Sequence, residues 1–488
     1  MRRQLVLAIC STSLLLVGLD ATIVNVALPA IQRSLHSSLS ELQWVVDAYT
    51  LVVASLLMLA GSTADRLGRR RVFQAGLALF SLGSLLCALA PGVELLVAFR
   101  VVQATGGAML SPVAMSIVRN VYEDPRARAR AIGVFAAMFG ISMALGPVLG
   151  GFLVTATSWR AIFYVNLPVG LAAIALTALF VPESRAPRPR RIDPVGQLLV
   201  IVGLGALTYA IIEGGRVGFG APGIVTLLAL AFACLAALVV YELHRREPLL
   251  EVRFFRSIPF AGASAIAVCL FAATGGFLFM STLYLQDVRG FTPLHAGLYL
   301  LPMAAMMIVF SPVSGRLVGR FGSRPSMVAG GLAVLASGLM LTGLAPDTRV
   351  ALLLGAYAVF GVGSALVNPP ITNTAVSGMP PAQAGVASAV ATTSRQVGMT
   401  LGVAVLGAVA GGGIAGAIGP GFAQATHPVW WIVAALGLVV AALGFLTTTD
   451  WARDTARRTA ERLEEPEVID LEPRERAVGG AGQAVSAR

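Results

Sequence analysis

The chain has 488 residues, of which 57% are hydrophobic and only 12% are charged, and its mean hydropathy is +0.81. This composition excludes a water-soluble globular protein and indicates an all-α polytopic membrane protein. All the basic residues are arginines, and the net charge of +11 predicts membrane topology and contact with the lipid bilayer rather than nucleic-acid binding. Because a Walker motif needs a lysine and the longest polar region is the tail, we expect no enzyme.

Fourteen apolar runs are close to the length of about 20 residues that a spanning helix needs. After the last run the chain becomes charged, which predicts a short amphipathic helix and then a disordered tail. The four histidines are dispersed and the four cysteines lie inside apolar runs, so we expect no metal site and no disulfide. The runs lie near residues 5–28, 44–64, 73–91, 94–118, 130–155, 161–181, 195–213, 222–241, 259–284, 294–314, 326–345, 350–375, 386–411 and 429–449.

The arginines are distributed unevenly between the two sides of these spans. If both termini are cytoplasmic, 28 arginines lie in cytoplasmic segments: two at the N-terminus, four after each of spans 2, 4, 6 and 8, three after span 10, and seven in the tail. This is the positive-inside pattern, so we expect both termini to be cytoplasmic. The lysine-free, alanine-rich composition favours a prokaryotic inner (plasma) membrane. The other seven comprise Arg33, Arg160, Arg216, Arg289 and Arg349 outside, and Arg100 and Arg395 within spans.

One basic turn occurs twice, as GSTADRLGRRRVF from Gly61 to Phe73 and as GRLVGRFGSRPSM from Gly315 to Met327. The alternative to a repeat is a generic cytoplasmic turn, but one offset of 254 residues explains several matches and therefore predicts two related halves. The expected organisation is an N-terminal six-helix bundle (1–182), a linker with two inserted spans (183–258), a C-terminal six-helix bundle (259–450) and a cytoplasmic tail (451–488). The offset also pairs Arg66 with Arg320, Gly68 with Gly322 and Arg70 with Arg324.

Four charged residues lie within predicted spans, namely Asp20, Asp47, Arg100 and Arg395. A charge in a spanning helix costs about 2.5–3.5 kcal/mol on insertion scales, so it indicates a function. The alternative is that they form structural ion pairs, or that Asp47 reaches the outer interface. Desolvation favours the neutral form of a buried carboxylate and a nearby arginine favours its ionised form, so such a carboxylate is suited to carry a proton or to attract a cation.

The motifs together resemble the 14-span drug:proton antiporter branch of the major facilitator superfamily over nearly the whole chain. The segment from Leu19 to Ile31 is similar to the span-1 signature of that branch, and RVVQATGG from Arg100 to Gly107 to its proton-linked span-4 motif. The first copy of the basic turn resembles the gating motif, and LGPVLGG from Leu145 the antiporter motif. The resemblance implies two six-helix bundles plus two inserted helices.

The resemblance also implies roles for individual residues. Asp65 would contact the start of a helix in the opposite half and stabilise the outward-facing state, while Gly319 replaces the expected acid in the second copy. The gating motif would comprise Gly61, Asp65, Arg66, Gly68, Arg69 and Arg70; the antiporter motif Gly146, Pro147, Gly150 and Gly151; and the proton-coupling group Asp20, Arg100 and Gln103. The predicted substrate pathway comprises Asp47, Asn25, Trp44, Tyr49, Phe139, Met143, Phe277 and Tyr284.

The expected function is export of small amphipathic or lipophilic, often cationic, compounds by a proton-coupled antiporter that works as a monomer by alternating access. No cofactor is expected, because the proton gradient supplies the energy. One alternative keeps the fold and exports an endogenous metabolite, a lipid or a self-made antibiotic. Another is a non-transporting sensor or a channel, which would be expected to carry a signalling domain or a pore-loop filter. The sequence contains neither feature.

Overall fold

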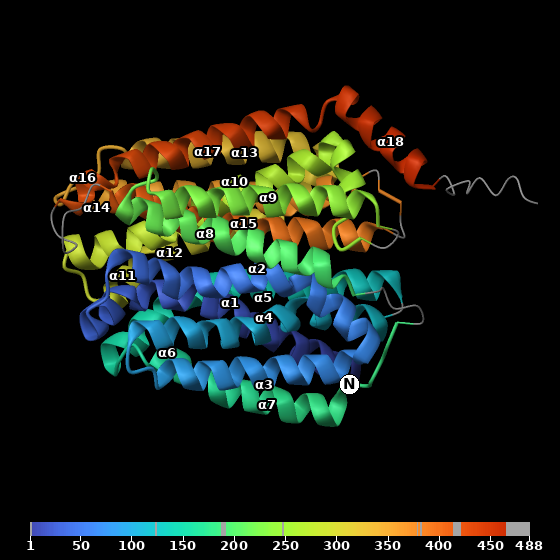
Figure 1. The fold of residues 1–488 in the computed structure, drawn as a ribbon, viewed down its shortest axis with the longest axis horizontal. Helices are drawn as coiled ribbons and strands as arrows, with labels where there is room; N and C mark the ends of the chain where they lie inside the picture. The colour runs from blue at the N-terminus through green and yellow to red at the C-terminus, as the bar shows by residue number, and fades with distance from the viewer. Residues whose placement is uncertain are drawn as a thin grey trace, which may run out of the picture.

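The protein is described by a computed structural model, which covers residues 2–122, 124–186, 192–245, 248–377, 379–380, 383–412 and 421–464. Every regular element in these ranges is a helix, as is expected of a chain whose backbone must satisfy its own hydrogen bonds in lipid. The long helices run side by side in one bundle, with the amino terminus and the last helix at the same end (Figure 1). We refer to this end as the basic end, because the first turn of the helix Arg69–Ala88, with Arg69, Arg70 and Arg71, lies there, and to the opposite one as the far end.

The helices follow one another with short connections. The first group is α1 (Arg2–Leu35), α2 (Leu39–Leu67), α3 (Arg69–Ala88), α4 (Val93–Val121), α5 (Pro125–Ala156), α6 (Ala161–Tyr164) and α7 (Asn166–Phe180). Two helices follow, α8 (Pro194–Val217) and α9 (Pro222–Leu243). The remaining elements are η1 (Val252–Arg256), α10 (Ile258–Leu283), η2 (Tyr284–Val288), α11 (Pro293–Tyr299), α12 (Leu301–Phe321), α13 (Ser323–Leu341), α14 (Val350–Val376), α15 (Ala384–Gly411), α16 (Phe422–Ala425), α17 (His427–Leu446) and α18 (Asp450–Glu464).

The helix ends follow from local sequence signals. Ser38 and Glu41 form a reciprocal capping box that starts α2, and Asp193 caps α8 directly before a proline. Gly68 ends α2 with a φ of 116°, and Gly322 ends α12 with a φ of 77°. Only glycine adopts such values without strain. These two residues are paired by the sequence repeat, so equivalent turns join equivalent helices in the two parts of the chain.

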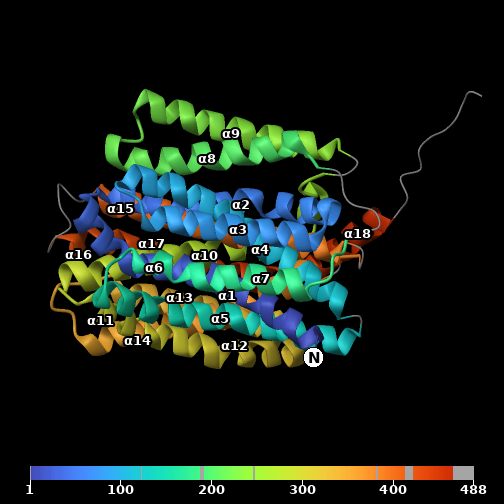
Figure 2. The same cartoon turned by 90° about the horizontal axis from the view of Figure 1, so that it is seen from below.

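Helices α1–α7 form one half of the molecule and α10–α17 form the other (Figure 1). The pair α8 and α9 lies together along one face, outside both halves (Figure 2). Helix α8 touches each half, since Gln197 Nε2 donates to the Ser55 carbonyl of α2 at 2.7 Å and Gly215 lies against Ala408 of α15.

Twelve helical segments in the described ranges are long and apolar enough to cross a membrane. The sequence predicts fourteen spans. Helices α5 and α15 occupy the two remaining predicted positions, with lengths of 32 and 28 residues. Helix α15 is less apolar than its neighbours because it contains Arg395 and Gln396, and in α5 the described apolar stretch is the shorter segment Ile141–Ala156.

Hydrogen bonds between the halves cluster from the middle of the bundle to the far end. Gln43 Nε2 donates to the carbonyls of Val403 and Ala404, each at 3.0 Å. Gln286 Nε2 donates to the Val26 carbonyl at 2.8 Å, and the hydroxyls of Thr50 and Thr400 lie 2.9 Å apart. The two halves are therefore joined at the far end.

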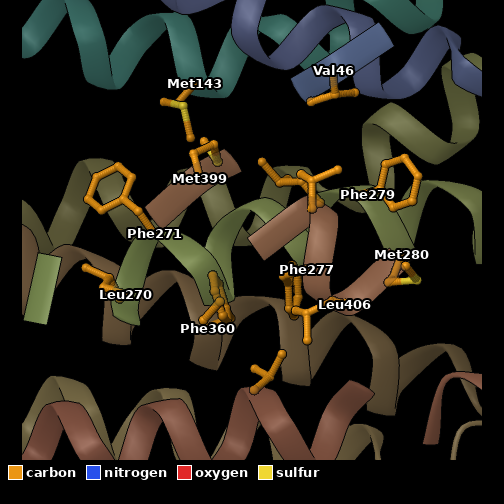
Figure 3. Close-up of a cluster of buried hydrophobic side chains, with 14 of the residues drawn as sticks. Val46, Met143, Leu270, Phe271, Phe277, Phe279, Met280, Phe360, Met399 and Leu406 are labelled. Carbon is orange, nitrogen blue, oxygen red and sulfur yellow. The ribbon is translucent and has the colours of Figure 1, made fainter. Parts of the chain in front are cut away.

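An aromatic core fills the C-terminal half. The ring of Phe277 is stacked on Phe360 with centroids 4.1 Å apart, and it also contacts Tyr357 and Trp430 edge-on. Above this core, Phe271 and Met399 lie opposite residues of the other half (Figure 3). Phe271 and Met399 are therefore part of the surface between the halves, whereas Phe277 is enclosed within one half.

Candidate functional site

A buried ion pair joins α1 to α4 in the middle of the N-terminal half. Asp20 has no exposed surface and Arg100 only 1%, and the guanidinium Nη1 of Arg100 forms an ion pair with Asp20 Oδ2. The Arg100 Nε also donates to the Val45 carbonyl of α2 at 3.1 Å, and its Cζ lies 4.3 Å from the centre of the Tyr49 ring. The charge on Arg100 is thus compensated by an anion, a backbone carbonyl and an aromatic face.

Amide and hydroxyl groups extend this ion pair into a network. Gln103 accepts from Arg100 Nη1 at 2.7 Å and donates to Asp20 Oδ1 at 2.7 Å and to Ser84 Oγ at 2.8 Å. Asn166 donates to the same Ser84 hydroxyl at 2.9 Å and to Asp20 Oδ1 at 3.4 Å. Helices α1, α3, α4 and α7 therefore all contribute to one polar site. The sequence predicts Asp20, Arg100 and Gln103 together, and the structure brings them together.

The network is suited to couple a proton to a structural change. If a proton binds Asp20, the carboxylate loses its charge, and Arg100 loses its main partner in a medium where an unpaired charge is costly. The neutral donors and acceptors of Gln103, Ser84 and Asn166 can rearrange around either state of the carboxyl group.

Asp47 lies apart from this network, on the α2 surface that faces the other half. It has no exposed surface, and its carboxylate Oδ1 accepts from the hydroxyl of Thr50 at 3.5 Å. Its Oδ2 has no hydrogen-bond partner among the described residues. Gln43, one turn before it, and Thr50, nearly one turn after it, both bind α15. The carboxyl group is thus enclosed where the two halves meet.

The other predicted pathway residues occupy three kinds of place. Met143 is buried at the surface between the halves, opposite Met399 (Figure 3). Tyr49 and Asn25 are buried within the N-terminal half, and Trp44 lies against Tyr209 of α8 with ring centroids 5.7 Å apart. Phe277 and Tyr284 are enclosed in the C-terminal half, and the side chain of Phe139 lies outside what the structure describes. These residues do not form a single group in this conformation.

The predicted gating motif packs against the start of the linker. Asp65 Oδ1 accepts from Arg69 at 3.0 Å, and the carboxylate of Glu183 accepts from the backbone N–H of Arg70 at 3.1 Å. The backbone of Asp65 also accepts from Ala186 at 3.1 Å. Asp65 is therefore paired within its own half in this conformation, and the expected contact with the opposite half is absent among the described contacts.

The remaining residues of the gating motif lie around this turn. Arg66 is exposed, and Gly61 is partly exposed and faces Pro112 of α4. The turn residue Gly68 has the Glu183 carboxylate 2.7 Å from where its Cβ would lie. A larger side chain there would displace Glu183 as well as strain the backbone.

The predicted antiporter motif allows close contacts on two sides of α5. A Cβ at Gly146 or Gly150 would collide with Thr22 or Ile23 of α1. A Cβ at Gly151 would collide with the Pro293 carbonyl of α11, in the other half. On the opposite side of the same contact, Gly297 of α11 meets the carbonyl of Pro147. Backbones of the two halves thus touch directly at the far end.

Several residues of the site were not predicted from the sequence. Ser84 and Asn166 complete the Asp20 network, while Gln43, Thr50 and Thr400 hold the halves together. Asn166 is an amide in an otherwise apolar segment, and this was the available signal, whereas Gln43 follows the polar stretch SSLSEL just before the predicted span 44–64. Serine and threonine are too common in membrane helices to be distinguished by sequence alone.

Comparison with known proteins agrees with this architecture. The family model described as Major Facilitator Superfamily matches residues 10–403. The multidrug resistance protein Stp of Mycobacterium tuberculosis is 41% identical over 411 residues, which cover 84% of this chain and 76% of that protein. The methylenomycin A resistance protein of Streptomyces coelicolor is 37% identical over 399 residues, which cover 82% of this chain and 84% of that protein.

A solved structure shows the same fold. It is that of a bacterial homologue of the human drug peptide transporters PepT1 and PepT2, which superimposes with a TM-score of 0.66 at 15% identity and covers 94% of this chain and 99% of that one. The fold of two helical halves built from membrane-length helices, together with these matches, identifies a multi-pass membrane transporter and not an enzyme. The chain belongs to the Major Facilitator Superfamily. Its homologues include multidrug and antibiotic resistance transporters.

Proposed function

We propose that the protein is a proton-coupled antiporter that exports small amphipathic or lipophilic compounds by alternating access between its two halves. The observation that carries this proposal is the fully buried Asp20–Arg100 pair with its Gln103, Ser84 and Asn166 partners. A network of this kind has two charge states, and switching between them changes which groups α1 and α4 can bind. No cofactor is needed, because the proton gradient supplies the energy.

The contacts between the halves support the alternating-access part of the proposal. They join the halves from the middle of the bundle to the far end, at Gln43, Thr50 and Gly151. In the proposed topology all fourteen helical segments span the plasma membrane and both termini are cytoplasmic, so the far end faces outward. The structure then corresponds to a state that is closed on the outside, and transport requires these contacts to separate.

The cargo is proposed from the relatives and from the surface between the halves. Stp is named for multidrug resistance, and a protein of Streptomyces glaucescens that is 36% identical is named for tetracenomycin C resistance and export. Met143, Phe271 and Met399 provide adaptable apolar contacts. Export of a single compound that the cell makes itself is a second candidate, because the Streptomyces relative is named for one compound.

The proposal is tested with the purified protein in liposomes that contain a pH-sensitive dye. When a transported compound from a panel of antibiotics is added, protons should cross the liposome membrane only if the protein is present. An imposed pH gradient should drive the compound against its own concentration gradient. A protonophore should abolish this uphill transport. Uphill transport that persists in the protonophore would contradict proton coupling, and absence of transport for the whole panel would contradict drug export.

A further inference from the structure

A second intramembrane arginine, Arg395 of α15, lies in the C-terminal half and differs from Arg100 in its partners. Its Nε donates to Asn368 Oδ1 at 3.1 Å, and its Nη2 donates to the Thr372 hydroxyl at 2.6 Å. Both partners belong to α14 and both are neutral. In the part of the chain that the structure describes, Arg395 forms no ion pair.

A guanidinium without an anion is costly at this depth in a membrane protein, unless water or an anionic ligand reaches it. Arg395 lies near the middle of α15, about 7.5 Å along the helix axis from Thr400, where the halves are joined, and toward the basic end. Arg395, Asn368 and Thr372 are each partly exposed. Arg395 is therefore partly accessible on the side of the bundle where the described residues form few contacts between the halves.

The surroundings of Arg395 are apolar and lie on the surface between the halves. Its Cζ is 5.9 Å from the centre of the Phe271 ring of α10. Met399 lies one helical turn further along α15, and it lies opposite Met143 of the other half, with Phe271 beside it (Figure 3). A fixed positive charge thus borders an adaptable apolar surface, which is a combination that fits an amphipathic molecule with one anionic group.

The acidic residues near this surface do not offset the charge. Asp20 is neutralised by Arg100, and neither has more than 1% of its surface exposed. Asp47 is completely buried where the halves meet. Both carboxylates are thus withdrawn from solvent in this conformation, while Arg395 is not. The accessible charge is positive, which disfavours the cationic cargo expected from the sequence.

We propose that Arg395 is the cargo-binding residue for an anionic group, such as a carboxylate, an enolate or a sulfonate, on an otherwise apolar molecule. Asn368 and Thr372 hold the guanidinium against α14, and its remaining N–H groups donate to the anion. Phe271 and Met399 contact the apolar part. This inference rests on the proposed export function, because it assigns the charge of the cargo at the same surface.

The test measures binding of matched probes to the purified protein without a pH gradient. Radiolabelled 2-naphthoate, 2-naphthamide and 2-naphthylmethylamine share one apolar ring system and carry a negative, a neutral and a positive group. The wild-type protein should bind the carboxylate at least about tenfold more tightly than the amide, as expected for a charge-assisted hydrogen bond, and the amine most weakly. R395Q should lose the preference for the carboxylate over the amide, R395K should keep most of it, and R349Q, which removes an exposed arginine at the far end, should keep all of it.

The proposal would be overturned if the wild-type protein bound the three probes equally, bound none of them, or bound the amine most tightly. An unchanged preference in R395Q would also overturn it. Thermal unfolding and size-exclusion chromatography establish whether R395Q is folded. If R395Q is unfolded, the order of the three affinities in the wild-type protein and the preference of R395K for the carboxylate test the proposal. A wild-type protein with the predicted preference that shows no pH-driven export would contradict the proposed function and leave this binding site intact.

Discussion

At the scale of single residues, the ion pair of Asp20 and Arg100 combines stability with a capacity to switch. A buried pair contributes little to stability compared with apolar residues of the same size, but removal of one partner leaves an uncompensated charge at a cost of about 3–5 kcal/mol. The pair is thus stable only while Asp20 is ionised, because Arg100 keeps its positive charge. Protonation of Asp20 produces the unfavourable combination and provides a driving force for rearrangement.

Replacement of the carboxyl group should separate the two roles of this pair. Asp20→Asn should abolish uphill efflux driven by a pH gradient and should lower the melting temperature, because Arg100 is left without an anion. The double variant Asp20→Asn, Arg100→Gln removes both charges and should recover most of the melting temperature but none of the pH-driven efflux. Efflux assays in proteoliposomes and thermal unfolding in detergent measure the two effects. Recovery of pH-driven efflux in the double variant would show that the pair is structural only.

At the scale of helical elements, the turn between α2 and α3 packs against the start of the linker that follows the first half. Asp65 pairs with Arg69, while Glu183 holds the backbone of Arg70 and fills the space beside Gly68. Asp65 retains 33% of its side-chain surface exposed. It is therefore free to exchange its partner at modest cost when the halves rearrange, since an exposed ion pair is worth at most about 1 kcal/mol.

The proposed gating role of Asp65 predicts an effect on the transport rate rather than on the affinity for cargo. Asp65→Asn should lower the transport rate several-fold with little change in the equilibrium affinity for cargo, because Asp65 lies in the last turn of helix α2 at the basic end, away from the surface between the halves. Glu461→Gln, in the exposed part of α18, is a control that removes a negative charge at the same end. Single-turnover efflux and equilibrium binding provide the two numbers. A large loss of affinity at an unchanged rate is the opposite result and would argue against gating.

The contact between α5 and α11 is the second element whose role can be tested. A Cβ at Gly297 would collide with the carbonyl of Pro147, so Gly297→Ala should force the halves apart at the far end. Overpacking costs about 1–3 kcal/mol, which corresponds to a shift of at least about fivefold toward the state open at the far end. Pulsed EPR between spin labels at the exposed residues Ser158 and Asp347 measures this population.

The matched control for this substitution is Gly319→Ala, because a Cβ at Gly319 has no neighbour within 4 Å. The control should leave the distance distribution between the labels unchanged. An identical distribution in Gly297→Ala would show that the halves do not separate at this contact during transport.

At the scale of the whole molecule, the helices form two halves that are bridged on one face by α8 and α9 (Figure 2). The inserted pair does not lie between the halves, and only α8 has substantial contact with both. Gln197 binds α2 near the basic end of the bundle, whereas Gly215 contacts α15 near the far end. Helix α8 thus contacts one half near the basic end and the other half near the far end. When the halves move relative to each other, at least one of these two contacts must shift.

The proposed topology predicts which residues can be labelled from each side of the membrane. In a cysteine-free background, single cysteines at Arg71 and Arg453 should react with a membrane-impermeant maleimide only after the membrane is opened, whereas a cysteine at Arg216 should react in intact cells. These three arginines have exposed side chains, so access does not depend on unfolding. A tail cysteine at position 453 that reacts in intact cells would rule out fourteen spans with both ends inside.

Much of the fold could be predicted from the sequence because membranes restrict the possible structures. Apolar length identifies helices, arginine marks their basic ends, and the repeated turn relates Gly68 to Gly322, both of which have a positive φ. Asp20 and Arg100 were identified because charged side chains are rare in spanning helices, and Gln103 was added to them by the resemblance of RVVQATGG to a family motif. Each of these signals is local, or depends on a cost that applies to any helix in lipid.

What the tertiary structure decided is which side of each helix meets which neighbour. Phe277 and Met143 are equally apolar in the sequence, yet Phe277 is enclosed by Phe360 and Trp430 while Met143 faces the other half. Arg100 and Arg395 are both intramembrane arginines, yet only Arg100 meets a carboxylate. Composition determines that a residue enters the membrane, because transfer into lipid depends on the residue type. Its partners depend on helix rotation and crossing, which arise from packing between segments that are hundreds of residues apart.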